Sequence, residues 1–319
     1  MLPGALDRNG PPEGLVRTCS IWRALEVLGD TPSLLILEAI WLGERRFEPI
    51  RARTCLSKPL VSDRLKALVE NGILARVPYS ERPLRYEFRL EPKGLDLFPV
   101  TMMLLRWEKT WSARRDALGI AVFHTGCGHQ TVPVPQCDHC GKEVVAEAIA
   151  WEEGPGLGWM EPTYTRRRQQ RNRTAISRQA TLFTDAAEVL GDRWSNLVMR
   201  SAFTGLNRFD QMLADSAMAS NILADRLSWL VERGFLKAKL YQSRPDRFAY
   251  YPTRKALDYL PILLMLQRWG DRYYAADEGP PVLLRHTTCG ARLDLVAGCG
   301  ACGGQLAAQT VKLVGAADG

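Results

Sequence analysis

The hydrophobic positions between residues 19 and 54 predict three successive helices. In the first helix, apolar side chains recur at three- and four-residue steps: Ile21, Trp22, Leu25 and Leu28. Gly29-Asp30 ends this helix, and Thr31-Pro32 begins the next one, because a capping residue followed by proline is a helix start. Residues 34–41 are apolar on nearly every side, which indicates a central helix. A shorter helix is expected over residues 47–53.

A fourth helix and a hairpin follow. A cap and a proline at residues 57–59 start a helix, and Gly72 is its C-terminal stop. Three residues of this helix face inward by their spacing: Val61, Leu65 and Leu68. Strand-like runs at 74–79 and 85–90 flank a charged loop with a proline, which indicates a two-stranded hairpin. Residues 93–111 form a long amphipathic segment that a proline interrupts.

The whole pattern occurs twice, at an offset of 162 residues and without a gap. Residues 26–30 reappear as 188–192, and Trp107 reappears as Trp269. The 319-residue chain therefore holds two copies of one module, and each copy is long enough to bury its own core.

The composition is that of an ordinary globular protein, with 46% hydrophobic and 24% charged residues. No uninterrupted apolar run approaches the ~20 residues of a membrane helix, so no membrane partner is expected. Residues 1–14 are rich in glycine and proline and do not resemble a secretory signal, so we expect a cytoplasmic, nucleoid-associated protein. The net charge of +7 is compatible with a nucleic-acid partner without proving one.

Six of the eight cysteines fall in two copies of one pattern: His-x2-Cys, nine residues, then Cys-x2-Cys. The copies are His124, Cys127, Cys137 and Cys140, and His286, Cys289, Cys299 and Cys302. Three thiolates and one imidazole suit tetrahedral zinc, and two short ligand pairs brought together by a hairpin form a zinc ribbon. We therefore expect two structural zinc sites, one in each repeat, because four protein ligands leave no open position for a substrate.

Two other interpretations of these residues are small core cysteines and cysteines that oxidise in pairs. The CxxC-type spacing in a chain without a recognisable leader favours metal over disulfides. His129 and His139 are alternatives to His124 as the fourth ligand. Their counterparts are Ala291 and Ala301, so only His124 and His286 serve in both repeats.

The order helix, helix, short helix, capped helix and hairpin is that of a winged helix-turn-helix. Residues 19–111 resemble the HxlR-type winged-helix transcriptional regulators, and residues 178–273 resemble them more weakly. Short motifs carry the resemblance: Gly29-Asp30, Arg46-Phe47, Ser62-x-Arg64-Leu65, Asn71-Gly72, Pro83-x-Arg85-Tyr86 and Pro92-x-Gly94. The second copy departs from them at Asn221, Ala224 and Ala256.

The resemblance implies double-stranded DNA as the partner. Members of this family are homodimers that use their first and last helices as the interface, so it also implies a second copy of the chain or an internal pairing of its halves. The helices at 57–71 and 219–233 are then the recognition helices, whose exposed polar face enters the major groove.

We predict DNA contacts from this face, its flanks and the arginines of the hairpin, or wing. In the first repeat they are Ser57, Lys58, Pro59, Ser62, Asp63, Arg64, Lys66, Arg82 and Arg85. In the second repeat they are Ser220, Asn221, Ala224, Asp225, Arg226, Arg244 and Arg247. Asn221 has an amide edge suited to adenine. The alternatives are a solvated helix face, solubilising wing arginines, and acidic residues that pair with nearby arginines.

Cys19 stands where many HxlR-type proteins carry an N-terminal cysteine, and some of these are redox sensors. In a redox sensor, the N-terminus of the helix would lower the pKa of the Cys19 thiol and favour the reactive thiolate. Alternatively, Cys19 is only a small apolar residue that packs at the start of a helix. The arginines between residues 166 and 178 either form an arm that follows DNA or belong to a solvated linker. No catalytic constellation and no phosphate-binding glycine loop occurs, so no enzyme is expected.

These features predict an α+β protein, mainly α with small β, in which two tandem winged helix-turn-helix domains are each followed by a small zinc ribbon. The expected boundaries are 1–17 for a flexible arm, 18–117 and 178–278 for the winged helices, 118–150 and 279–315 for the ribbons, and 151–177 for an Arg-rich linker.

The predicted function is a sequence-specific, double-stranded DNA-binding transcriptional regulator, a repressor, that acts as an intramolecular pseudo-dimer. The alternatives are a protein-interaction adaptor and a redox- or ligand-responsive switch, in which the second winged helix does not bind DNA. The sequence identifies no small-molecule effector.

Overall fold

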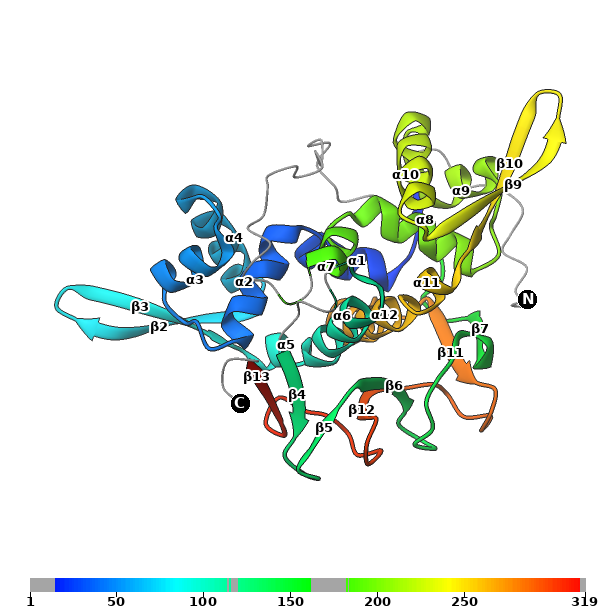
Figure 1. Ribbon diagram of the computed structural model, residues 1–319. Helices are drawn as coiled ribbons and strands as arrows, with labels where there is room; N and C mark the ends of the chain where they lie inside the picture. The colour runs from blue at the N-terminus through cyan, green and yellow to red at the C-terminus, as the bar shows by residue number, and fades with distance from the viewer. Residues whose placement is uncertain (1–14, 114, 116–119, 162–181, 183, 316–319) are drawn as a thin grey trace. The chain divides into compact units, whose positions relative to one another are not determined.

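The computed structural model describes residues 15–113, 115, 120–161, 182 and 184–315. The chain divides into two compact units, and each unit draws on both repeats. Unit A consists of residues 24–136, 169–192 and 296–319, and contains the first winged helix. Unit B consists of residues 1–23, 137–168 and 193–295, and contains the second (Figure 1).

The winged helix of unit A follows the order that the sequence predicts. Its elements are α2 (Thr31–Trp41), α3 (Phe47–Thr54), α4 (Lys58–Glu70), β2 (Leu74–Glu81), β3 (Leu84–Leu90), α5 (Pro92–Leu95) and α6 (Phe98–Trp111). Asp30 caps α2 by accepting a hydrogen bond from the Ser33 amide at 2.9 Å. Val61, Leu65 and Leu68 are buried, so the inward face of α4 is confirmed. The amphipathic segment is two helices, with Pro99 in the first turn of the second.

Unit B repeats this arrangement. Its elements are α8 (Arg193–Phe203), α9 (Phe209–Ser216), α10 (Ser220–Glu232), β9 (Leu236–Ser243), β10 (Asp246–Pro252), α11 (Arg254–Leu257) and α12 (Leu260–Tyr274). Both hairpins are antiparallel, and their outermost pairs are Glu81 with Leu84 and Ser243 with Asp246. The predicted α+β fold with two winged helices is confirmed.

The first helix of the second repeat, α7 (Thr184–Leu190), belongs to unit A, not to the unit that holds the rest of its repeat. It docks on α6, where the Glu108 carboxylate accepts hydrogen bonds from the amides of Asp185 (3.2 Å) and Ala186 (2.8 Å). Burial raises the pKa of Glu108 to about 7 against the lowering effect of these amides. An acid on the last helix of one repeat therefore anchors the first helix of the other.

The first helix of the first repeat, α1 (Ser20–Leu28), starts in unit B in the same way. The Ser20 hydroxyl donates a hydrogen bond to Asp271 of α12, and Arg23 donates to the carbonyl of Tyr274 at 2.7 Å. The rings of Trp22 and Trp194 lie 5.4 Å apart, centroid to centroid. Each repeat thus gives the start of its first helix to the other repeat's last helix.

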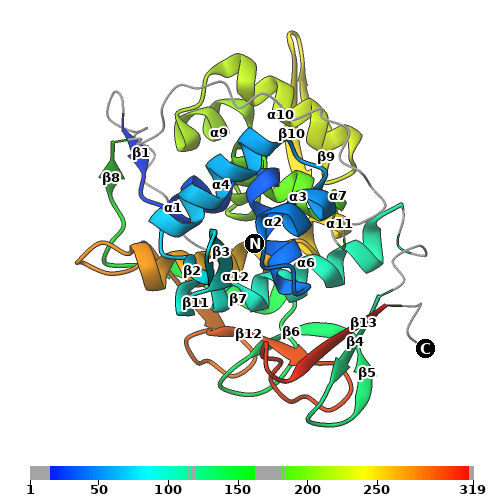
Figure 2. The ribbon, with the colours of Figure 1, turned by 90° about the vertical axis from the view of Figure 1, so that its left-hand side faces the viewer.

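The C-terminal strands are exchanged as well. In unit A, β4 (Ile120–His124) pairs on one side with β5 (His129–Thr131) and on the other with β13 (Val311–Gly315), as Figure 2 shows. In unit B, β11 (Val282–His286) pairs with β7 (Ile149–Glu153). A further pair joins β6 (Pro133–Cys137) to β12 (Leu295–Cys299).

The prediction of consecutive domains along the chain is therefore wrong for the ribbons, at 118–150 and 279–315. Each observed ribbon combines a first half from one repeat with a second half from the other. Two segments that we expected to be unstructured also contain strands, because β1 (Val16–Arg17) pairs with β8 (Trp159–Met160). The arginines between 166 and 178 lie outside the described residues. Within the described residues, no helix is long and apolar enough to cross a membrane.

Candidate DNA interface and metal centres

The helix-turn-helix of unit A consists of α3, a tight turn and α4. The turn passes through Cys55, whose φ of 54° is left-handed, and Ala217 has the corresponding φ of 49° in unit B. The outward face of α4 is exposed over its first three turns: Ser57, Lys58, Pro59, Ser62, Asp63 and Lys66. Among the described residues, Lys66 has one ion pair, an exposed one with Glu70 at 3.7 Å, which leaves its charge available to a phosphate.

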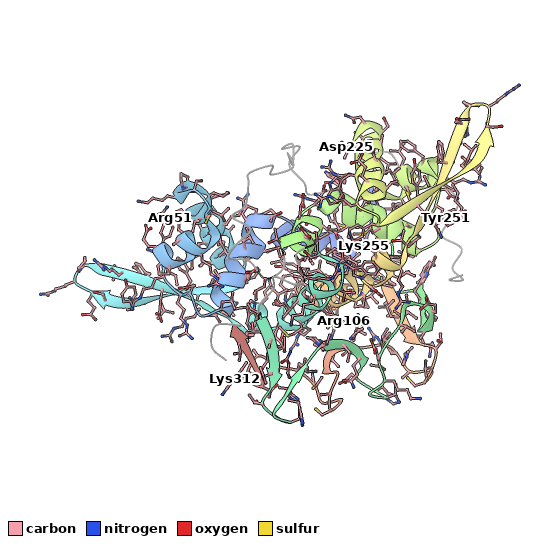
Figure 3. All side chains as sticks on the ribbon, in the orientation of Figure 1. Arg51, Arg106, Asp225, Tyr251, Lys255 and Lys312 are labelled. Atoms are coloured by element: carbon pink, nitrogen blue, oxygen red, sulfur yellow. The ribbon has the colours of Figure 1, made fainter. Side chains whose placement is uncertain are left out.

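The corresponding face of α10 is also exposed and less charged. It consists of Ser220, Asn221, Ala224, Asp225 and Ser228. Asp225 lies on α10, on the surface of unit B (Figure 3). Neither lysine of the α4 face has a basic counterpart here, since Ser220 and Ser228 occupy those positions.

Two arginines that we predicted to flank these faces also have partners within the protein. Arg64 donates from Nε to Asp30 Oδ1 at 3.0 Å and pairs with Asp63 through Nη1. Because Asp30 also caps α2, Arg64 ties α4 to the start of α2 and holds the helix in place. Arg226 has a side chain only 9% exposed and pairs with Asp225. Both arginines therefore help to hold their helices in place, and their roles as DNA contacts stay predictions.

The predicted wing arginines lie at the hairpin tips and are exposed: Arg82, Arg85, Arg244 and Arg247. Within the part of the chain that the structure describes, none of the four forms an ion pair. Unpaired guanidinium groups at a hairpin tip suit phosphate oxygens or a narrow minor groove.

Contacts that the sequence analysis did not predict join each wing to its helix-turn-helix. The Arg46 guanidinium lies 4.3 Å from the ring centroid of Tyr79, and Arg208 lies 4.7 Å from that of Tyr241. Backbone bridges join Arg46 to Glu87 and Arg208 to Ala249. The repeat contains a sequence pattern that could have predicted this contact, because both copies have arginine and tyrosine at the same two positions.

The segments that hold the two helix-turn-helix and wing elements differ in charge. Residues 44–90 carry eleven Lys or Arg and six Asp or Glu, a net charge of +5. The corresponding residues 206–252 carry seven and five, a net charge of +2. Phosphate attraction is therefore stronger for the first winged helix.

The metal ligands predicted from the sequence gather into two clusters of four, but not in the predicted sets. In unit A the cluster is His124, Cys127, Cys299 and Cys302. Cys127 Sγ lies 3.9 Å from Cys299 Sγ, and Cys302 Sγ lies 3.3 Å from His124 Nδ1. Burial acts to raise the pKa of Cys299, but hydrogen bonding with Thr131, whose hydroxyl oxygen lies 3.2 Å from Cys299 Sγ, and with backbone amides lowers this pKa to about 6, which favours the ligating thiolate.

The cluster of unit B is Cys137, Cys140, His286 and Cys289. Cys137 and Cys289 have their sulfurs 4.0 Å apart, and His286 Nδ1 lies 3.4 Å from the sulfurs of both Cys140 and Cys289. The prediction of one complete set within each repeat is corrected, because each site takes a His-x2-Cys pair from one repeat and a Cys-x2-Cys pair from the other. The physical reason is the strand pairing, which puts β4 beside β13 and β11 beside β7.

The geometry of both clusters fits a tetrahedral ion. With zinc bonds of about 2.3 Å to sulfur and 2.0–2.1 Å to nitrogen, a tetrahedron has edges of about 3.8 Å between two sulfurs and about 3.6 Å between sulfur and nitrogen. Five of the distances between donor atoms lie between 3.3 and 4.0 Å, close to these edges, and all four donor atoms of each cluster lie within 4.8 Å of one another. They far exceed the ~2.05 Å of a disulfide bond. His129 and His139 belong to neither cluster and are exposed.

Cys19, the predicted redox residue, is buried just before α1. It lines a cavity in unit B together with Arg17 and Arg200. Cys55 is exposed in the turn of the first helix-turn-helix.

Similar proteins from several organisms are described as transcriptional regulators. An uncharacterized HTH-type transcriptional regulator of Mycobacterium tuberculosis is 39% identical over 138 residues, which are 43% of this chain and 87% of the relative. A regulator of the same description from Bacillus subtilis is 32% identical over 90 residues, 28% of this chain and 83% of its own. A solved structure from Pseudomonas aeruginosa, provisionally described as a transcription factor, is 38% identical and covers 35% of this chain and 76% of its own, with a TM-score of 0.29. The model of the HxlR-like helix-turn-helix family matches residues 27–116 and 189–278, more than half of the chain, and the protein therefore belongs to this family of transcriptional regulators.

Proposed function

We propose that this regulator binds a specific double-stranded DNA site with both of its winged helices and represses transcription by occupying that site. The observation that carries the proposal is the exposed polar face of α4 and α10, each beside a wing with unpaired arginines at its tip. The comparisons favour a regulator over an adaptor, because the family model matches the second winged helix as well as the first.

In this proposal the chain acts as an intramolecular pseudo-dimer. The exchanged helices support it, since the start of each repeat's first helix is docked on the other repeat's last helix through Glu108 or Asp271. A covalent connection keeps the two repeats at a high effective concentration, so pairing would not depend on the concentration of the protein. A second copy of the chain is then not required for binding.

The proposal includes one structural zinc ion in each cluster. His124, Cys127, Cys299 and Cys302 would hold one ion, and Cys137, Cys140, His286 and Cys289 the other. A zinc ion with four protein ligands crosslinks chain segments and takes no part in a reaction. Because each cluster joins both repeats, the metal would stabilise the exchanged arrangement.

Selection of bound sequences from a random DNA library, using the full-length zinc-loaded protein, tests the function. We expect one enriched site with two recognisable halves, and loss of enrichment in a variant that carries both Ser62→Ala and Lys66→Ala. Lys312→Ala is the matched control, since Lys312 is an exposed lysine of the same unit on the ribbon strand β13 (Figure 3). A library with no enriched sequence, or equal loss in the control, would refute DNA recognition by this face.

The protein would bind as a monomer if the pseudo-dimer is correct. The mass of the complex on a DNA fragment, measured by analytical ultracentrifugation, should correspond to one 35.8 kDa chain for each site. Two chains on each site would show instead that the halves pair between molecules.

A further inference from the structure

Unit B contains a cavity of about 180 Å³ that neither DNA binding nor the zinc clusters use. It lies among α8, α12, the strands β7 and β11, and the segment from Arg17 to Ile21. Its walls are mostly aliphatic and include Leu260, Leu263 and Leu264. An apolar cavity of ~150 Å³ is large enough to hold a benzene molecule, so this one accommodates a single ring with a short substituent.

Two buried nitrogen atoms in the cavity wall have no hydrogen-bond partner among the described residues. They are Nε of Arg200 and Nε1 of Trp151, and both side chains belong to residues that line the cavity. Arg200 is 9% exposed and Trp151 is 6% exposed. Other buried atoms of the described residues, such as Nε of Arg53, are unsatisfied too, but only these two donors belong to residues that line the cavity. Both nitrogens are covered by protein atoms, so an acceptor bound in the cavity would reach them once the two side chains turn toward it.

The same wall carries an excess positive charge. Arg17 and Arg200 both pair with one carboxylate, that of Asp215, at 2.9 and 2.6 Å. Ser201 donates a further hydrogen bond to this carboxylate. Burial raises the pKa of Asp215, but the two arginines outweigh it and lower that pKa, so the group stays ionised. Two cations facing one carboxylate favour a second anion nearby. The other acidic groups that act on Arg17 are the Cys19 thiol, which lines the same cavity, and the Glu153 carboxylate, which is exposed to solvent.

Unit A lacks these features at the corresponding positions. Arg200 corresponds to Glu38, and Trp151 corresponds to Leu313. Glu38 is buried in unit A, where its carboxylate accepts a hydrogen bond from the Leu182 amide at 2.8 Å. Ala202, which lines the cavity, corresponds to the larger Ile40. The donors and the free volume therefore occur together in unit B and are not a general property of the repeated module.

We propose that this cavity binds a small aromatic monocarboxylate of the size of benzoate. The ring would occupy the aliphatic part of the cavity, which Trp151 and Phe203 also line. The carboxylate would accept hydrogen bonds from Arg200 Nε and Trp151 Nε1 and balance the excess charge of the Arg17–Asp215–Arg200 cluster. This site is independent of the proposed DNA binding, and it can be tested without DNA.

Isothermal titration calorimetry with the full-length zinc-loaded protein tests the proposal, with benzoate as the probe. We expect saturable binding at one site per chain. Benzyl alcohol has the same ring without the charge, and it should bind roughly 10- to 100-fold more weakly, the usual loss for a hydrogen bond to a charged group. No saturable binding of benzoate, or equal binding of the two compounds, would overturn the proposal.

Two variants locate the site. Ala202→Ile introduces the side chain that the other repeat carries at this position, and it should abolish benzoate binding by filling the cavity. Trp151→Phe removes one donor and keeps a ring, so it should weaken benzoate binding by roughly tenfold and leave benzyl alcohol binding nearly unchanged. Trp159→Phe is the matched control, since Trp159 is an exposed tryptophan of the same unit that does not line the cavity.

Thermal unfolding and circular dichroism would show whether each variant is folded. If a folded Ala202→Ile variant binds benzoate as the unmodified protein does, the ligand lies elsewhere and the assignment is wrong. If both variants fail to fold, the comparison of benzoate with benzyl alcohol on the unmodified protein still decides whether a carboxylate is recognised.

Discussion

Cysteine replacements in pairs distinguish an exchanged zinc site from a site formed within one repeat. In the structure Cys127 shares a cluster with Cys299, although Cys137 is much nearer along the chain. The double variant Cys127→Ala/Cys299→Ala therefore damages one cluster twice and leaves the other complete. The double variant Cys127→Ala/Cys137→Ala removes one ligand from each cluster. We expect one tightly bound zinc ion in the first variant and none in the second, because tight structural sites need four ligands.

The structure also gives the size of the stability change. A link between Cys127 and Cys299 closes 172 residues of chain. Loop-closure entropy for a crosslink of that span corresponds to about 5 kcal/mol at 25 °C, whereas a link between Cys127 and Cys137 closes only ten residues and corresponds to about 3 kcal/mol. The full 172-residue value would apply only if no other link joined the repeats. In Cys127→Ala/Cys299→Ala the unit B cluster still joins Cys137 to Cys289, so the lost link closes only the two ten-residue segments between the clusters. The free energy of unfolding should therefore fall by about 3 kcal/mol from this effect alone. Because the link joins the repeats, the loss should appear in the unfolding of both winged helices.

Zinc is best counted after dialysis against a competing chelator under reducing conditions, by elemental mass spectrometry. Three-ligand sites release their metal in this treatment, and complete sites retain it. Cys55→Ala is the control and should retain two zinc ions, since Cys55 is exposed and belongs to neither cluster.

The opposite result would refute the exchange. If Cys127→Ala/Cys137→Ala retains one ion and Cys127→Ala/Cys299→Ala retains none, each site forms within its own repeat. If the unmodified protein retains no zinc at all, the metal proposal itself is wrong.

Three further predictions concern DNA binding and pH. Lys58→Ala and Lys66→Ala should weaken binding to all sequences and reduce the slope of log K against log salt by about 0.9 each, measured by fluorescence anisotropy; an unchanged slope would mean that neither lysine meets a phosphate. Asn221→Ala should relax base preference on one side of the site by about 1–3 kcal/mol in competition with mismatched DNA, and an unchanged preference would exclude a bidentate contact. Between about pH 4.5 and 7, the folded protein keeps a proton on Glu108 that the unfolded chain has lost, so the free energy of unfolding should fall by up to about 3 kcal/mol as pH rises. In urea titrations at several pH values, Glu108→Gln should make this pH dependence weaker. An equal pH dependence in the variant would assign it to other groups.

The winged helices could be predicted from the sequence because local patterns determine them. The spacing of Val61, Leu65 and Leu68 specifies the buried face of α4, and cap and proline signals specify where α2 and α4 begin. The wing strands were predicted within two residues at the turn, since alternating side chains and a proline loop mark a hairpin. These signals act over a few residues and need no knowledge of distant contacts.

The pairing of the ligand sets could not be predicted in this way. Both repeats have the same ligands at the same spacing, so any combination of a His-x2-Cys pair with a Cys-x2-Cys pair satisfies the local pattern. The choice depends on whether β4 pairs with a strand of its own repeat or with β13, which is a contact across almost two hundred residues. The role of Arg64 was hidden for the same reason, because its partner Asp30 precedes it by 34 residues.

In our proposal, the exchange of helices and strands between the repeats and the difference between the two recognition faces have a common physical basis. In a homodimer every substitution occurs in both subunits, so the two recognition faces stay identical and favour a symmetric site. A tandem chain that pairs with itself is free of this constraint, because each face can change alone while the exchanged helices and zinc ligands keep the halves together. The two faces have diverged accordingly, with a net charge of +5 against +2 and Lys66 replaced by Ser228. The cavity of unit B is a second difference between the halves, since Glu38 and Leu313 stand in unit A at the positions of Arg200 and Trp151. Duplication therefore allows one half to specialise in phosphate attraction while the other acquires a binding site of its own.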